Sequence, residues 1–189
     1  MGAFIKNCHV YDRALSDIAN RLTKMSRFDF YLIDSGARWV TVFPCGPTNV
    51  FWVAEKLSDV LSTGVLATMV QDDDQLYYLL HEYGKEVDEL NSNPFYYGEE
   101  AREESLFDPE DSPRKLLRYA PPGTTIDDIA VALDKAQEEY LASDGLKILG
   151  KALGIDPEII SFTAWYFLIG EIIAPGKEPI LIKGKKEVF

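Results

Sequence analysis

Short apolar runs alternate with apolar positions at helical spacing along the first half of the chain. A run of about four to eight apolar residues between turn residues is typical of a strand, whereas apolar residues three and four positions apart indicate a helix. The runs predict strands at 3–10, 28–33, 38–43, 65–70, 76–82 and 86–90. The spaced positions predict two helices, one capped by Asp12 and one running from Thr48 or Asn49 to a stop at Gly64.

The order strand–helix–strand–strand–helix–strand predicts the sheet of an α/β (α+β) domain. This order is that of a split βαβ, or ferredoxin-like, unit. Turn signals at 72–74 and 83–85 separate the last three strands, so we expect a β-meander to extend the sheet at one edge. The continuous apolar run at 65–70 indicates a strand that is covered on both faces.

The C-terminal part of the chain is expected to be helical and to pack on the sheet. Thr125 and Asp128 have the spacing of a capping box at a helix start. Asp156, followed by a proline and a glutamate, is typical of another helix start. The remaining expected elements are a helix between 143 and 154, a helix or strand at 165–169, and an edge strand at 179–183.

We expect one domain in three parts, because 189 residues bury one core well and are few for two. The parts are a sheet core at 1–94, an acidic excursion with several prolines at 95–122, and a helical part at 123–189. Residues 99–111 hold seven acidic residues against the single Arg102. We expect this stretch to be disordered or loosely packed on the surface, with aromatic residues holding its ends.

The charge balance narrows the range of partners. The chain has 31 acidic and 19 basic residues, a formal net charge of −12 and a pI near 4.6. Such a field repels phosphate backbones, so we expect no nucleic-acid partner. The longest apolar stretch is too short to span a bilayer, so we expect no membrane partner. Two cysteines make no disulfide framework and no signal-peptide pattern is present, which predicts a cytoplasmic protein.

Motifs for common enzyme chemistry are missing from the sequence. It contains no Gly-x-Ser-x-Gly nucleophile elbow, no Gly-x-Gly-x-x-Gly loop and no Walker pattern. A zinc site would need converging ligands, yet Cys8 and His9 are neighbours on a predicted strand and point to opposite faces. Cys45 and His81 lie far along the chain. The sequence therefore favours a protein without catalytic activity and predicts no cofactor.

Three consecutive aspartates provide the most suggestive candidate for a site. Carboxylates on a turn can bind Mg²⁺ or Ca²⁺, and Asp88 on the next strand could join Asp72 and Asp74 as a third ligand. A solvated hairpin turn explains the same residues, because neighbouring side chains leave a turn in different directions. Trp39 and Asn91 are further candidates for binding. Alternatively, Trp39 packs in the core, and the Asn91 side chain forms hydrogen bonds with the backbone of its own turn.

A sequence pattern over residues 38–94 resembles that of a group of uncharacterised bacterial proteins. Its parts are Trp-Val-Thr-Val-Phe, then Asp-x-Asp-x-x-x-Tyr, then Gly-x-x-Val-Asp-x-x-x-Ser-x-Pro. The resemblance implies that the acid-bearing hairpin is one structural unit of a bacterial protein. It implies no activity.

The sequence predicts an acidic binding or interaction protein of the cytoplasm. In its concrete form, the protein neutralises a basic protein partner by electrostatic complementarity. The alternative is a hydrolase that uses a divalent metal held by Asp72, Asp74 and Asp88. A structural subunit whose interface includes the helix bearing Trp52 is a third interpretation, and the oligomeric state stays open.

Overall fold

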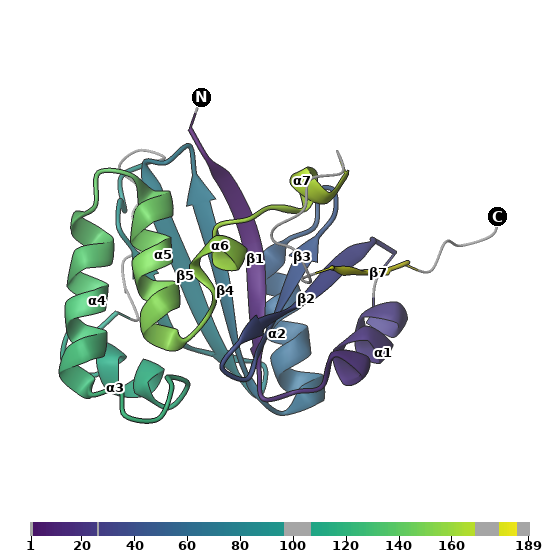
Figure 1. The fold of residues 1–189 in the computed structure, drawn as a ribbon, viewed down its shortest axis with the longest axis horizontal. Helices are drawn as coiled ribbons and strands as arrows, with labels where there is room; N and C mark the ends of the chain where they lie inside the picture. The colour runs from purple at the N-terminus through teal and green to yellow at the C-terminus, as the bar shows by residue number, and fades with distance from the viewer. Residues whose placement is uncertain (1, 26, 97–106, 169–177, 185–189) are drawn as a thin grey trace.

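The computed structural model describes residues 2–25, 27–96, 107–168 and 178–184 (Figure 1). In this part of the chain a seven-stranded sheet has the order β6-β5-β4-β1-β3-β2-β7, and all neighbouring strands are antiparallel. The strands are β1 (Phe4–Tyr11), β2 (Phe30–Gly36), β3 (Trp39–Pro44), β4 (Gly64–Gln71), β5 (Gln75–Glu82), β6 (Lys85–Asn91) and β7 (Ile180–Ile182). The helices are α1 (Leu15–Met25), α2 (Val50–Leu61), α3 (Ser112–Leu117), α4 (Ile126–Glu138), α5 (Ala142–Leu153), α6 (Pro157–Ile160) and α7 (Ala164–Leu168).

The structure confirms most of the predicted elements of the chain. The first six strands and the first two helices follow the expected order, with ends that differ by no more than three residues. The strand expected at 179–183 is β7, and it lies at the edge of the sheet beside β2. The ambiguous stretch at 165–169 is helical in α7 as far as Leu168, and residue 169 lies outside the described part.

Helices cover both faces of the sheet (Figure 1). Buried residues of α1 and α2, among them Leu22 and Leu57, form one cluster with Val10 of β1. Buried residues of α3, α4 and α5, among them Leu149, form a second cluster with Tyr78 of β5. Successive strand residues point to opposite faces, so the central strands supply side chains to both clusters. This explains why the apolar run in β4 is continuous.

Two expected helix boundaries are wrong, both for reasons of tertiary structure. Asp12 does not cap α1: it has a positive φ of 51°, and its carboxylate pairs with the guanidinium of Arg38. Gly64 does not end α2, because Ser62 takes the left-handed cap conformation with φ 50°. Gly64 instead begins β4, where any Cβ would collide with the ring of Tyr119.

The structure describes part of the acidic excursion. Residues 99–106 of its acidic stretch lie outside the described residues. Beyond them α3 forms, and its Leu116 and the following Tyr119 are buried in the second cluster. Among the residues that the structure describes, none of the helices combines the length and apolar character that crossing a membrane requires.

Candidate binding groove

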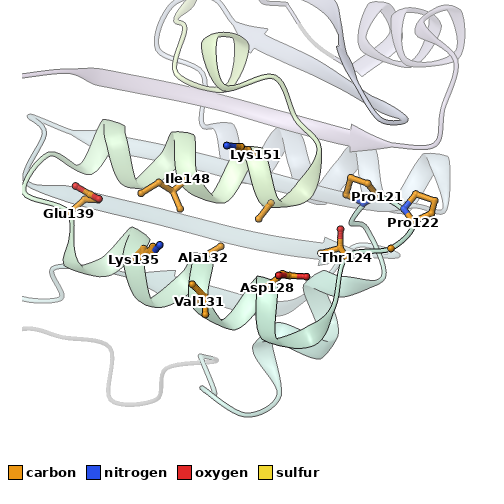
Figure 2. Close-up of a pocket in the computed structure, with 12 residues that line it drawn as sticks. Pro121, Pro122, Thr124, Asp128, Val131, Ala132, Lys135, Glu139, Ile148 and Lys151 are labelled. Carbon is orange, nitrogen blue, oxygen red and sulfur yellow. The ribbon is translucent and has the colours of Figure 1, made fainter.

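An open groove of about 830 Å³ lies between α4 and α5 (Figure 2). Its floor is apolar, with Ala132 buried and Ile148 and Ala152 half-buried. Val131 of α4 lines the same groove and keeps 50% of its surface exposed. The loop at 121–124, which contains two prolines, lies at one end. The groove therefore offers unpaired apolar surface that a partner's side chain could cover.

Local sequence signals fix the two helices that form the groove. Thr125 starts α4 with a capping box, in which its hydroxyl accepts from the Asp128 N–H at 3.2 Å and the Asp128 carboxylate accepts from the Thr125 N–H at 2.8 Å. Gly145 of α5 lies against the carbonyl of Ala136, where a Cβ would collide. Gly154 ends α5 in the left-handed conformation with φ 73°. The caps thus fix where the two helices begin and end, and Gly145 allows their close approach.

Charged side chains stand around the apolar floor. Lys135 of α4 and Lys151 of α5 line the groove with Asp128 and Glu139 (Figure 2). Hydrogen bonds from the hydroxyl and the N–H of Thr125 hold the pKa of Asp128 below its usual range, so this carboxylate is ionised. Within the described residues, neither lysine has an ion pair. The groove thus offers charged groups of both signs.

A row of acidic side chains follows the outer face of α4 beside the groove. Asp127, Asp134 and Glu138, which we call the acidic ridge, are separated by seven and four positions and so lie on one side of the helix. All three are exposed, and none forms an ion pair within the described part of the chain. Val131 lies between them in the same row and also lines the groove. The ridge and the groove are therefore neighbouring parts of one surface.

The three aspartates predicted as a site form the turn between β4 and β5, and the carboxylates of Asp72 and Asp73 accept hydrogen bonds from the protein's own backbone. The Asp72 carboxylate accepts from the Gly2 N–H at 3.0 Å. Asp73 accepts from the Ala3 N–H at 2.8 Å and from the Ser143 N–H at 3.3 Å. A hydrogen bond with the Ser143 hydroxyl and the bonds from the N–H groups of Ala3 and Ser143 hold the pKa of Asp73 down. Together with the Gly2 bond to Asp72, they fasten the turn to the start of β1 and of α5.

Asp88 is not close to that turn. It pairs across the strands with Leu80, near the far end of β5 from the turn. Within the described residues, no three His, Cys, Asp or Glu side chains gather as metal ligands. The structure therefore does not bring Asp72, Asp74 and Asp88 together as the metal hypothesis requires.

The Asp88 side chain instead anchors α3 to the sheet. It is fully buried and accepts from the hydroxyls of Tyr78 at 2.7 Å and Ser112 at 2.6 Å. The Lys115 ammonium lies 3.4 Å away. Burial raises the pKa of Asp88, although these donors favour the charged form. A buried carboxylate with this many partners is a structural feature.

Trp39 and Asn91, the other two candidates, also serve the fold. Trp39 is buried, and its indole N–H donates to the carbonyl of Leu153 at 2.9 Å. The Asn91 side chain accepts from the Gln75 amide at 2.7 Å and from the Asn93 N–H at 3.1 Å. Neither residue lines the groove.

The cysteines and histidines are dispersed. Cys8 and His9 point to opposite faces of β1, as their adjacent positions predicted: Cys8 lies in the α1–α2 cluster, and His9 is buried between Thr41 and Thr68. Burial raises the pKa of the Cys8 thiol and lowers that of His9 to about 3. Both groups are therefore neutral and buried, so neither is accessible to a ligand.

Sequence reasoning missed the groove residues. A signal was present, because Val131 and Ile148 are apolar residues at positions that their helices expose or half expose. The sequence does not show that these two residues, which lie on different helices, line the same groove; the fold was needed to show it.

Comparisons with protein-family models, with curated proteins and with solved structures found no significant match to this chain.

Proposed function

We propose that this protein is a non-catalytic binding protein whose groove and acidic ridge receive a basic amphipathic segment of a partner protein. The observation that carries the proposal is the row Asp127, Val131, Asp134 and Glu138. It sets three carboxylates, which have no ion pair among the described residues, along the border of an apolar groove. In this mode an apolar face of the segment covers the groove, and its flanking lysines or arginines contact the ridge.

The charge of the whole chain supports the same kind of partner. A formal charge of −12 attracts a cationic segment over long distances and raises its rate of association. The ridge then supplies short-range contacts at the rim, where each exposed ion pair contributes about 0.3–0.5 kcal/mol. Coverage of the groove floor supplies most of the affinity, because apolar burial contributes about 25 cal/mol per Å².

The two lysines of the groove restrict the partner. Lys135 and Lys151 would repel a uniformly basic segment that enters the groove itself. A fitting segment therefore carries its cations along the ridge side and offers apolar groups, or an acidic residue, toward the lysines. This requirement distinguishes a specific partner from any polycation.

A charge-matched comparison tests this proposal. The triple variant Asp127→Asn/Asp134→Asn/Glu138→Gln removes the ridge charges, and Asp59→Asn/Glu110→Gln/Glu158→Gln removes three charges from exposed positions elsewhere. Each protein is immobilised and offered bacterial lysate at salt concentrations from about 50 to 300 mM. We expect basic proteins that the wild type and the control variant retain at low salt and that the ridge variant loses. Equal recovery by the ridge variant and the control variant would refute the assignment of this face.

A second measurement separates groove from ridge. An amphipathic helical peptide with leucines on one face and lysines along one border is labelled and titrated, with fluorescence anisotropy as the readout. We expect the ridge variant to weaken binding about tenfold, from three rim pairs together. Val131→Ser should weaken it with unchanged salt dependence, because Val131 contributes apolar contact alone. Polylysine of equal charge should bind less tightly than the amphipathic peptide, and the reverse order would contradict the role of the groove.

We further infer that β1–α1–β2–β3–α2–β4 is a ferredoxin-like split βαβ unit, which β5 and β6 extend as a meander. The strand order β4-β1-β3-β2 with antiparallel neighbours supports this inference. The helical C-terminal part then packs on the face opposite α1 and α2, as the second core cluster suggests. In this view the binding groove belongs to a segment added to a common unit. Unbridged Cys8 and Cys45 agree with a cytoplasmic location.

A further inference from the structure

A second cavity, of about 510 Å³, lies between α1 and the C-terminal end of α2. It is on the helical layer that covers the other face of the sheet from α4 and α5 (Figure 1). Its lining is rich in basic and polar side chains, although the chain as a whole is strongly acidic. The lining residues are Arg13, Asp17, Asn20, Arg21, Lys24, Val60 and Leu61.

Arg13 holds a fixed position in this cavity. Its guanidinium donates to the carbonyl of Leu61 at 2.9 Å, to that of Ser62 at 2.9 Å and to that of Asp12 at 2.7 Å. The first two carbonyls are at the negative end of α2, so Arg13 compensates that end of the helix dipole. A guanidinium has five N–H donors, and three bonds leave two of them free. The fold therefore already holds the Arg13 guanidinium in one orientation, and a ligand that binds it loses little further side-chain entropy.

Arg21 and Lys24 add two cations on the neighbouring helix. With Asp17 and Asn20 they occupy positions three and four apart, on one side of α1. Both are exposed, and within the described residues neither has an ion pair. The cavity therefore gathers three cations against one carboxylate. Such an arrangement lowers the cost of placing an anion there.

We propose that this cavity binds a small phosphorylated polyol, such as a sugar phosphate. Arg13, Arg21 and Lys24 would bind the phosphate oxygens, for which arginine and lysine are suited. Asp17 and Asn20 would bind hydroxyl groups, which donate to a carboxylate and bond either way with an amide. The volume is within the range of about 300–1,000 Å³ that is usual for small-molecule sites.

The overall charge favours a small ligand over a larger anionic surface. A membrane or a nucleic acid would bring phosphates near acidic faces of the protein as well as near the cavity, and a charge of −12 repels it. Salt screens charges beyond about 8 Å, so a ligand that lies inside the cavity experiences mainly the three cations. The proposal is therefore limited to soluble molecules.

Isothermal titration calorimetry with glucose 6-phosphate tests the proposal on the full chain. Glucose and inorganic phosphate are the comparison ligands, and anionic vesicles and a short single-stranded DNA are titrated separately. The double variant Arg21→Ala/Lys24→Ala removes two cavity cations, while Lys85→Ala/Arg114→Ala removes one lysine and one arginine from exposed positions elsewhere. Arg13 is kept, because its bonds stabilise the end of α2.

We expect the wild type and the control variant to bind glucose 6-phosphate with equal affinity, and the cavity variant to bind it at least about tenfold more weakly. Inorganic phosphate should bind more weakly than the sugar phosphate, and glucose should not bind. Absence of binding at about 10 mM glucose 6-phosphate, or equal losses in both variants, would overturn the proposal. Tighter binding of inorganic phosphate, the vesicles or the DNA would overturn the choice of ligand.

Discussion

The burial of His9 leads us to predict that the protein loses stability in mildly acidic solution. The side chain is fully buried in the middle of the sheet, with one ring nitrogen 2.9 Å from the Thr41 hydroxyl and the other 3.2 Å from that of Thr68. Burial lowers its pKa from 6.5 to about 3, because desolvation penalises the charged ring. Two hydroxyls compensate the neutral imidazole well, since each can donate or accept.

The sign and size of the effect follow from the two pKa values. Above pH 6.5 His9 is neutral in the folded and the unfolded chain, and its contribution to stability is fully present. Below pH 6.5 the unfolded chain takes up a proton that the folded chain refuses until about pH 3, so stability falls as the pH falls through this window. The slope is about 1.4 kcal/mol per pH unit, which gives a loss of about 2 kcal/mol between about pH 7 and pH 5.

Urea unfolding at pH values of about 7, 6 and 5 measures this loss when the wild type is compared with His9→Gln. Glutamine keeps a polar amide near the two threonines and takes up no proton. Burial also lowers the pKa of His81, but that residue is present in both proteins and its effect cancels in the difference. We expect the variant to lose about 2 kcal/mol less than the wild type over this range.

Two results would refute this account of His9. One is an equal pH dependence of the free energy of unfolding in the wild type and in His9→Gln. The other requires no variant: an NMR titration of the folded wild type in which the His9 ring takes up a proton near its ordinary pKa of 6.5. In that case the ring is accessible to solvent, and its burial between the threonines does not describe the protein in solution.

Two substitutions test the packing of the helical layer. Asp88→Ala should destabilise the protein by about 3 kcal/mol in urea unfolding, because it leaves the hydroxyls of Tyr78 and Ser112 buried without an acceptor. Asp88→Asn keeps an acceptor oxygen and should cost less, and an equal loss would contradict this reason. Gly64→Ala should lower stability by about 2 kcal/mol through overlap with the Tyr119 ring. Tyr119→Leu should lower the free energy of unfolding less in the Gly64→Ala background than in the wild type. Equal losses in the two backgrounds would contradict the contact between these residues.

Signals that act within one turn of the chain were readable from the sequence. Asn49 caps α2, and the Thr125 capping box starts α4 where its spacing predicted. Gly154 and Asp156 also occupy their expected cap positions. These predictions succeed because a cap bonds backbone groups only two or three residues away, so its chemistry is complete in the local sequence.

The wrong predictions involve partners that are distant in sequence. Asp12 has the residue type of a helix cap, but its ion pair is with Arg38 in the turn between β2 and β3. Gly64 has the residue type of a helix stop, but its small size is required by Tyr119, which follows α3. In both cases the residue type correctly indicated a special position, but its contact partner lies far along the sequence and is known only from the fold.

The fold does not gather the candidate carboxylates Asp72, Asp74 and Asp88, for a related reason. In an acidic chain, pairs of carboxylates are common, and the sequence does not show which of them already bind the protein's own donors. The turn carboxylates Asp72 and Asp73 bond backbone N–H groups of β1 and α5, and Asp88 bonds the hydroxyls that fix α3. Among the described residues, the three carboxylates on the outer face of α4 have no such bonds and border the groove.

The net charge of −12 conceals a spatial separation of acidic and basic side chains that bears on both proposed ligands. The acidic ridge Asp127, Asp134 and Glu138 lies on α4, in the layer on one face of the sheet, whereas Arg21 and Lys24 lie on α1, in the layer on the other. A cationic segment is therefore attracted toward the ridge and turned away from α1, and a small anion experiences the opposite preference. Because the sheet separates the two surfaces, the proposed ligands do not compete for the same residues, and a change of charge at one site should leave affinity at the other unaffected beyond the screened long-range effect.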